Sequence, residues 1–198
     1  MIKNYEPAGI CSNIVKLFRK LIKGGARVLV AHTDHGKIYV MSGYAAICIP
    51  ETAYYHVVSG MHTDFASMPS EGIGIKIEHG KTSVISASEV AYMFEKLWDE
   101  NGIRRACPTP YRKDEYRIVS VQGSTKYEPS RPMFVDDGLL RCFYPEKWSW
   151  YSKHPYSPLM GIECKQYSRA LIMPVLGRIQ PTPIEEMIAN EYEKEQQK

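Results

Sequence analysis

Long apolar runs, signal sequences and common catalytic motifs are all missing from this sequence. No stretch approaches the ~18 consecutive apolar residues that a membrane-spanning helix needs. The first residues contain no apolar core typical of a secretory signal. The sequence therefore predicts a cytoplasmic protein that has no membrane partner.

Paired cysteines are also missing: the five cysteines are scattered and none belongs to a Cys-x-x-Cys pair. An odd, scattered set predicts reduced thiols rather than a disulfide framework or a zinc site. The sequence contains neither a Gly-x-x-x-x-Gly-Lys-Ser/Thr phosphate loop nor a Gly-x-Ser-x-Gly nucleophile elbow. We therefore expect no cofactor, and the motifs lean against an enzyme.

Apolar and charged residues occur in ordinary proportions. Hydrophobic residues make up 44% of the chain and charged residues 24%, which is enough apolar material for a core without a metal or disulfide. The net charge is +3. Because the residues after Pro183 are net acidic, the rest of the chain is more basic than this value. Such a balance allows an anionic partner without requiring one.

Hydrophobic periodicity predicts a helix and three strands at the start of the chain. Ser12 can cap the helix, and Gly24-Gly25 can end it. Short intervals between the strands favour antiparallel hairpins. The predicted helix is 12–23, the strands are 27–32, 37–42 and 44–49, and a brief helix at 51–59 precedes a loop at 60–72.

A second set of elements follows from residue 73. Ser86 and Glu89 form a capping-box pair at the start of a helix that Asn101-Gly102 ends. Thr182 and Pro183 start a terminal helix. Asp136-Asp137-Gly138 predicts a hairpin turn. The predicted strands are 73–77, 82–86, 116–122, 132–135, 139–143, 160–166 and 168–175, with a connector at 103–114 and a looser stretch at 144–158.

This order predicts an α+β fold. We interpret residues 1–180 as a single domain of two pseudo-similar halves, about 1–72 and 73–180. Each half would be an antiparallel sheet backed by one helix. Residues 181–198 would form a C-terminal helix and a frayed tail.

Four groups of residues could act chemically or bind a partner. His32, Asp34 and His35 could ligate a metal, since imidazole and carboxylate suit Zn, Fe or Mn. A metallo-β-lactamase-like hydrolase has a similar local string, but it places a further His-x-His upstream, where Val30-Ala31 stand here. We therefore favour a polar turn closed by Gly36.

The basic face of the first helix could contact nucleic acid, because lysine and arginine that neutralise phosphates release counterions. This face consists of Lys16, Arg19, Lys20 and Lys23. A second basic group, in the connector, consists of Arg104, Arg105, Arg112 and Lys113. For either group alone, a solvated surface is the simpler interpretation.

Aromatic residues gather in the looser stretch, where Trp148, Trp150 and Tyr151 could stack bases or dock a peptide. Tryptophan is usually largely buried, so burial in the core is the favoured interpretation. The interaction role remains an alternative.

The string Arg169–Val175 resembles the C-terminal strand of bacterial DNA polymerase sliding clamps (the β subunit). The segment Lys37–Pro50 is similar to the clamp's strand-turn-strand, although Met41-Ser42-Gly43 lacks the clamp's Asp. The chain is also similar to short proteins of phages and mobile elements. A clamp has three such domains per chain, whereas this chain has length for one and continues past Pro174.

The resemblance implies a clamp-like fold and a role in DNA replication, with helix lysines meeting the DNA backbone without reading bases. It also implies self-association, as a homo-oligomer, to complete a ring. The leading hypothesis is therefore a non-enzymatic, DNA-associated accessory protein of phage or mobile-element origin. The alternatives are a small metal-dependent hydrolase using His32, Asp34 and His35, and a protein-interaction module using the Trp148–Tyr156 loop.

Overall fold

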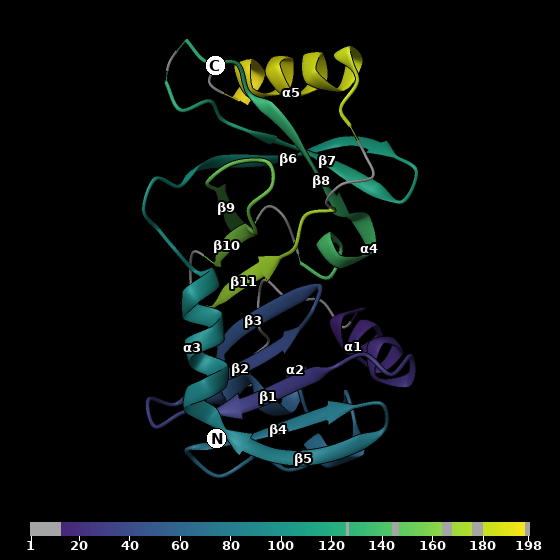
Figure 1. The fold of residues 1–198 in the computed structure, drawn as a ribbon, viewed down its shortest axis with the longest axis vertical. Coiled ribbons are helices and arrows are strands. Elements are labelled where there is room, and N and C mark those ends of the chain that lie inside the picture. Colours follow the sequence, from purple (N-terminus) through teal and green to yellow (C-terminus); the bar gives the residue numbers. More distant parts are fainter. Residues whose placement is uncertain (1–12, 126, 144–146, 164–167, 176–179, 197–198) are drawn as a thin grey trace.

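A single sheet of 11 strands organises the part of the protein that the structure describes. The computed structural model describes residues 13–125, 127–143, 147–163, 168–175 and 180–196 (Figure 1). The strand order is β5-β4-β1-β2-β3-β11-β10-β9-β6-β7-β8, and the strand pairs of the described chain are antiparallel. The predicted α+β class with antiparallel pairing is confirmed.

The sequence limits of these elements are as follows. The strands are β1 (Val28–His32), β2 (Lys37–Ser42), β3 (Ala45–Pro50), β4 (Ile73–Glu78), β5 (Lys81–Ser86), β6 (Arg104–Lys113), β7 (Tyr116–Val121), β8 (Arg131–Asp136), β9 (Trp148–Ser152), β10 (Leu159–Glu163) and β11 (Arg169–Ile172). The helices are α1 (Asn13–Lys23), α2 (Tyr54–Val57), α3 (Ala87–Leu97), α4 (Asp137–Leu140) and α5 (Pro183–Gln196), with 3-10 turns at Glu51–Ala53 and Thr63–Phe65. None of the helices in the described ranges is long and apolar enough to cross a membrane.

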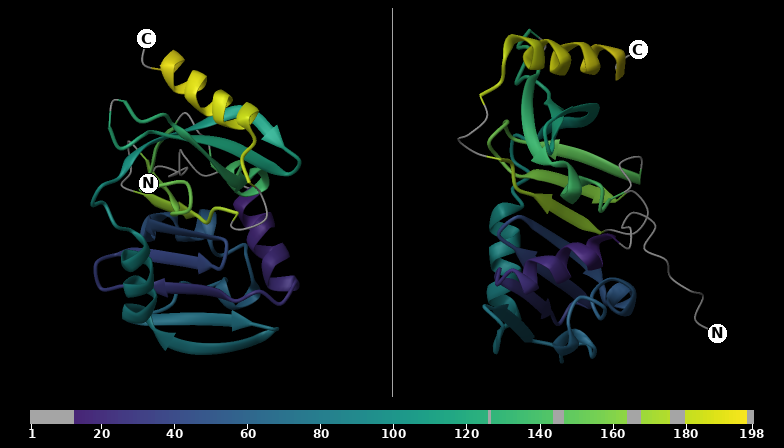
Figure 2. Two further views of the ribbon diagram at one scale, coloured as in Figure 1. Left: turned by 45° about the horizontal axis from the view of Figure 1, so that its top comes forward. Right: turned by 90° about the vertical axis from the view of Figure 1, so that its right-hand side faces the viewer.

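Helices lie against both faces of the sheet around β1 and β2 (Figure 2). Side chains alternate between the two faces of a strand, so Val28 and Val30 pack with Phe18 of α1, while Leu29 packs with Phe94 of α3. Both phenylalanines are fully buried. Burying a side chain of this size stabilises a fold by about 1.5–3 kcal/mol, so both helices are anchored to the sheet.

The helix α5 covers the other end of the sheet, against β7 and β8 (Figure 1). Ala189 of this helix is fully buried, and Ser120 Oγ donates a hydrogen bond to its carbonyl oxygen at 2.7 Å. At the start of the helix, the backbone N–H of Thr182 donates to Glu185 Oε2 at 2.6 Å. That bond is one half of a capping box.

The two ends of the sheet meet where β3 pairs with β11. Arg169 of β11 reaches α3, where its Nη1 donates to Glu95 Oε2 at 2.8 Å. Its guanidinium lies 5.0 Å from the ring centroids of both Phe94 and Trp98. Ion pairing and cation–π attraction at one side chain therefore join β11 to α3.

Several local predictions were wrong. The region expected to be a connector is the ten-residue strand β6, which carries a register shift between Pro108 and Arg112. The expected strand at 139–143 and its Asp-Gly hairpin are replaced by α4, because Asp136 Oδ1 accepts a hydrogen bond from the N–H of Leu139 and caps a helix.

Two further expectations differ from the structure. Ser86 stands at the N-cap of α3, but its hydroxyl bonds to Ser88 Oγ and makes no capping hydrogen bond. The strand β4 pairs with β1, so the sheet does not divide at residue 72, where we placed the boundary between halves. The predicted cap at Ser12 lies outside the described residues.

Candidate functional site

The exposed face of α1 is the main candidate site. Ile14, Phe18 and Ile22 are buried against the sheet. Val15, Leu17 and Leu21 flank this buried stripe and are half-buried, so at 3.6 residues per turn the remaining positions of the helix point outward. The outward positions include the four predicted basic residues, Lys16, Arg19, Lys20 and Lys23, and all four are exposed. The structure thus places these residues together on the solvent face of one helix.

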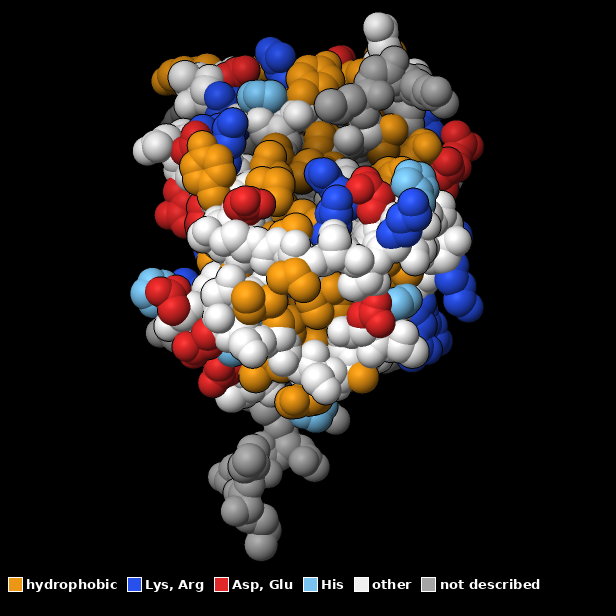
Figure 3. All heavy atoms as spheres, turned by 60° about the horizontal axis from the view of Figure 1, so that its bottom comes forward, with side chains coloured by type: hydrophobic (Ala, Val, Ile, Leu, Met, Phe, Trp, Pro, Cys, Tyr) orange, Lys and Arg blue, Asp and Glu red, His pale blue; other side chains and the backbone are white. Residues whose placement is uncertain are grey.

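The charge of this face has no ion-pair partner among the residues that the structure describes. The sequence of α1 contains no Asp or Glu. Within the described part of the chain, no ion pair involves any of the four basic side chains. Arg19 Nε donates to the carbonyl oxygen of Gly60, which fixes this side chain against its own domain. Figure 3 shows Lys and Arg side chains along the right-hand edge, the side on which α1 lies in Figure 1.

The second basic group separates into two parts. Arg112 pairs with Asp137 at 3.2 Å, and Lys113 pairs with Glu185 at 2.8 Å. Both side chains therefore hold elements of the fold together. Arg104 and Arg105, at the start of β6, instead line a pocket.

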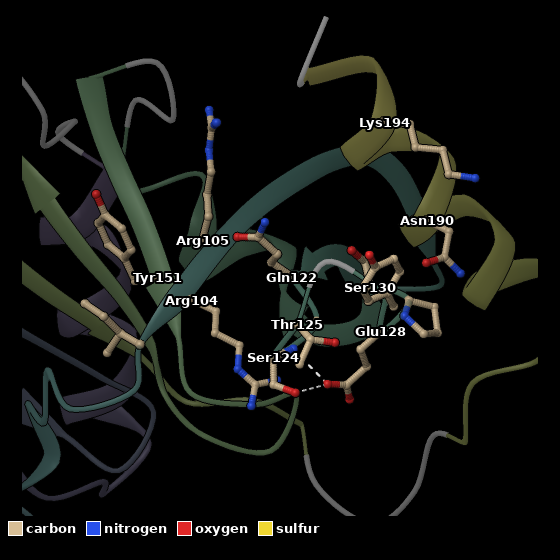
Figure 4. Close-up of a pocket in the computed structure, with 14 residues that line it drawn as sticks. Arg104, Arg105, Gln122, Ser124, Thr125, Glu128, Ser130, Tyr151, Asn190 and Lys194 are labelled. Carbon is tan, nitrogen blue, oxygen red and sulfur yellow. Dashed lines mark hydrogen bonds between the residues drawn. The ribbon is translucent and has the colours of Figure 1, made fainter.

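This pocket has a volume of about 910 Å³ and opens between β6, the loop after β7 and α5 (Figure 4). Arg104, Arg105 and Lys194 are its basic side chains, and Glu128 is acidic. Hydrogen bonds from Ser124 lower the pKa of the Glu128 carboxyl. A polar pocket with three cations favours an anionic group, so it is the main competitor to the α1 face as an anion site.

The three residues of the predicted metal motif do not face a common site. His32 is 4% exposed, and its ring contacts Pro69 and Glu51. Asp34 and His35 lie in the turn after β1, with side chains 79% and 81% exposed. Their closest charged atoms are 3.9 Å apart. The structure therefore separates His32 from the two residues with which the motif grouped it.

The aromatic residues of β9 are mainly core residues. Trp148 and Trp150 are 5% and 4% exposed. Their rings stack with centroids 5.7 Å apart, and Phe143 packs edge-on against both. Tyr151 is half-buried and lines the pocket of Figure 4. The two indoles are thus placed to pack in the core, not to meet a partner at the surface.

Sequence comparison gives partial similarities. No protein family model matches the chain. Over 124 residues, or 62% of the chain, it is 30% identical to interphotoreceptor matrix proteoglycan 2 of Rattus norvegicus. Over 126 residues it is 29% identical to the protein of the same name from Mus musculus. The chain spans 9% and 10% of the length of these two relatives, so this likeness does not show a family.

Similar solved structures include two chains of the sliding-clamp type. One is assigned as a DNA polymerase III beta subunit of Eubacterium rectale, with 11% identity, 87% of this chain and 68% of that chain covered, and a TM-score of 0.29. The other is the C. crescentus beta sliding clamp, with 11% identity, 89% and 67% covered, and a TM-score of 0.25. TM-scores this low support no conclusion about fold or function. The expected phage origin stays a prediction.

Proposed function

We propose that this protein is a DNA-associated accessory protein that holds the phosphate backbone against the exposed face of α1. The observation that carries the proposal is the group of four basic side chains on that face, which lack an ion-pair partner in the described chain. Phosphate contacts of this kind position a protein on DNA without reading its sequence. The proposed role is non-enzymatic.

The geometry of a helix supports this use of the face. Residues three and four apart are neighbours on a helix, so Lys16, Arg19 and Lys20 carry like charges side by side. Such pairs destabilise an isolated helix by about 0.2–0.5 kcal/mol each. An anionic polymer laid along the helix would relieve that repulsion and would release its own counterions.

The test is DNA binding followed by fluorescence anisotropy over a salt series. The variant is Lys16→Gln/Lys20→Gln, because Arg19 also bonds to the backbone of Gly60 and its loss could disturb the fold. Each phosphate contact contributes about 0.9 to the slope of log affinity against log salt. We therefore expect the double variant to lower this slope by about 2.

The matched control is Lys81→Gln/Lys96→Gln, which removes the same charge from exposed positions on β5 and α3. The slope of this control should stay close to that of the unchanged protein. Arg105→Gln/Lys194→Gln tests the competing pocket. A loss confined to the pocket variant would place the anion site there and contradict the α1 proposal. No DNA binding at low salt would contradict the function itself.

Self-association is a second part of the proposal, with a copy of the same chain as the partner. The strand β5 ends the sheet, and one edge of its backbone is left without a neighbouring strand in the described chain. Val84 on this strand is 72% exposed. An exposed edge is a template for strand pairing, and such pairing could extend the sheet toward a clamp-like ring.

The mass of the protein in solution, measured over a concentration series, tests this part. Val84→Lys should weaken the association, because charged side chains protect sheet edges. Lys96→Gln, on the neighbouring helix α3, is the control. A monomer at every concentration would contradict self-association and would leave the DNA proposal to its own test.

A further inference from the structure

A cluster of one histidine and two glutamates lies where the strand β1 ends, at His32. The three residues are His32, Glu51 and Glu71, and each offers one ligand atom. These ligand atoms all lie within 4.8 Å of one another. We propose that this cluster is a binding site for a divalent transition-metal ion such as Zn²⁺, Mn²⁺ or Co²⁺.

The orientation of His32 carries the argument. Its Nδ1 lies 2.9 Å from the carbonyl oxygen of Pro69. A carbonyl oxygen only accepts hydrogen bonds, so Nδ1 bears the proton. In the neutral ring, Nε2 then presents a lone pair. Metal-binding histidines are held in this way, with the outer nitrogen donating to a backbone carbonyl and the other nitrogen facing the ion.

The second ring nitrogen, Nε2, also faces an acceptor. Glu51 Oε2 lies 3.2 Å from His32 Nε2. Two acceptors at this distance repel each other unless a proton or a cation lies between them. Ligands about 2.1 Å from a tetrahedral ion are themselves about 3.4 Å apart. The observed separation is therefore close to that of two ligands on one metal.

Backbone hydrogen bonds hold the three segments of the site together. The N–H of Gly72, next to Glu71, donates to the carbonyl oxygen of His32 at 2.9 Å. The N–H of Glu51 donates to the carbonyl oxygen of Gly36 at 2.9 Å. The fold therefore holds the backbone segments that carry the three ligands before any ion arrives, which lowers the cost of ordering the ligands.

The burial of the ligands suits an accessible metal. The His32 side chain is 6% exposed, whereas that of Glu51 is 46% exposed and Glu71 is exposed. An ion can enter from the solvent side and retain a water there, as in open sites with three protein ligands. A neutral imidazole and two carboxylates also balance the charge of a divalent ion. Mixed nitrogen and oxygen ligands favour a transition ion over Mg²⁺ or Ca²⁺.

The alternative is a simple ion pair between protonated His32 and Glu51. Glu71→Gln separates the two interpretations, because it keeps the His32–Glu51 contact and removes the third ligand. The experiment titrates chelator-treated full-length protein with Co²⁺, followed by visible absorption and calorimetry, with Zn²⁺ as competitor. We expect the unchanged protein to bind one ion per chain. In Glu71→Gln the affinity for Co²⁺ should be at least about tenfold lower, because removing even a residue that only supports a metal ligand causes a loss of this size.

The matched control is Asp34→Asn/His35→Gln, which alters the exposed residues of the sequence motif and leaves the proposed ligands intact. This variant should bind Co²⁺ as the unchanged protein does. Circular dichroism of each metal-free variant establishes that the fold is retained. Absence of stoichiometric binding by the unchanged protein would overturn the site. Equal binding by Glu71→Gln would also overturn it, in favour of the ion pair.

Discussion

Gly161 provides a sharp test of the packing between β9 and β10. A methyl group placed on this residue would lie 2.7 Å from Cζ3 of Trp150 and 2.9 Å from Cε3 of Trp148. Carbon atoms in favourable contact are about 3.5–4.0 Å apart, so Gly161→Ala requires the rings or the strand to move by nearly 1 Å. The rings cannot move freely, because Phe143 packs edge-on against both.

The expected cost follows from overpacking. Extra methyl groups in a well-packed core cost about 1–3 kcal/mol, so we expect Gly161→Ala to lower the free energy of unfolding by about 2 kcal/mol. For a chain of this size, 1 kcal/mol changes Tm by about 2–4 °C. The midpoint of thermal unfolding should therefore fall by about 4–8 °C.

Denaturant and thermal unfolding, followed by tryptophan fluorescence and circular dichroism, measure this effect. Gly43→Ala is the control, since an added methyl group there would have no heavy atom within 4 Å. It should leave stability unchanged or raise it by about 0.4–1 kcal/mol through the unfolded state. If Gly161→Ala unfolded at the same midpoint as the unchanged protein, the indole stack described above would be refuted.

Two further predictions concern ion pairs. Asp137→Asn should lower the free energy of unfolding by about 3 kcal/mol, because the 8% exposed carboxylate pairs with Arg117 at 2.6 Å and the guanidinium would lose its buried partner. Chemical denaturation measures this change. As the control, the exposed Asp34→Asn should change the free energy of unfolding by less than about 0.5 kcal/mol. The hydrogen bond from Arg169 lowers the pKa of the Glu95 carboxyl below its ordinary 4.5. The stability from this pair is therefore fully present above pH 4.5 and lost as the pH falls through the folded pKa. The stability difference between the unchanged protein and Glu95→Gln should shrink in that acidic range, and a constant difference would contradict the assignment.

Local sequence patterns predicted the elements that depend on local physics. The helix α1 follows the apolar period of its own residues, and the strands β1 to β5 follow the composition of their own residues and the turns between them. The strand β6 was missed because Pro108 and Pro110 favour a connector, yet proline is tolerated at a strand irregularity, such as the register shift in this strand. In α4, the capping ability of Asp136 prevailed over the turn preference of Asp-Gly.

The two candidate sites also differ in how far the sequence could predict them. The basic face of α1 could be predicted because helical spacing alone puts its lysines and Arg19 on one side. The glutamates beside His32 could not, because Glu51 lies 19 positions away in sequence, in the 3-10 turn after β3. The sequence motif included His32, but its neighbours Asp34 and His35 lie in a turn and their side chains face the solvent. Only the pairing of distant segments brings carboxylates to the imidazole.

The pairing of β3 with β11 has a consequence for how the chain reaches its folded state. Arg169 and Cys48 are partners in this pairing and are 121 positions apart in sequence. During synthesis, β1 to β5 can pair among themselves while β3 still has an open edge. Contacts between distant segments form slowly, and open strand edges invite association with other chains. In the interval before β11 arrives, the open edge of β3 therefore favours aggregation of the nascent chain.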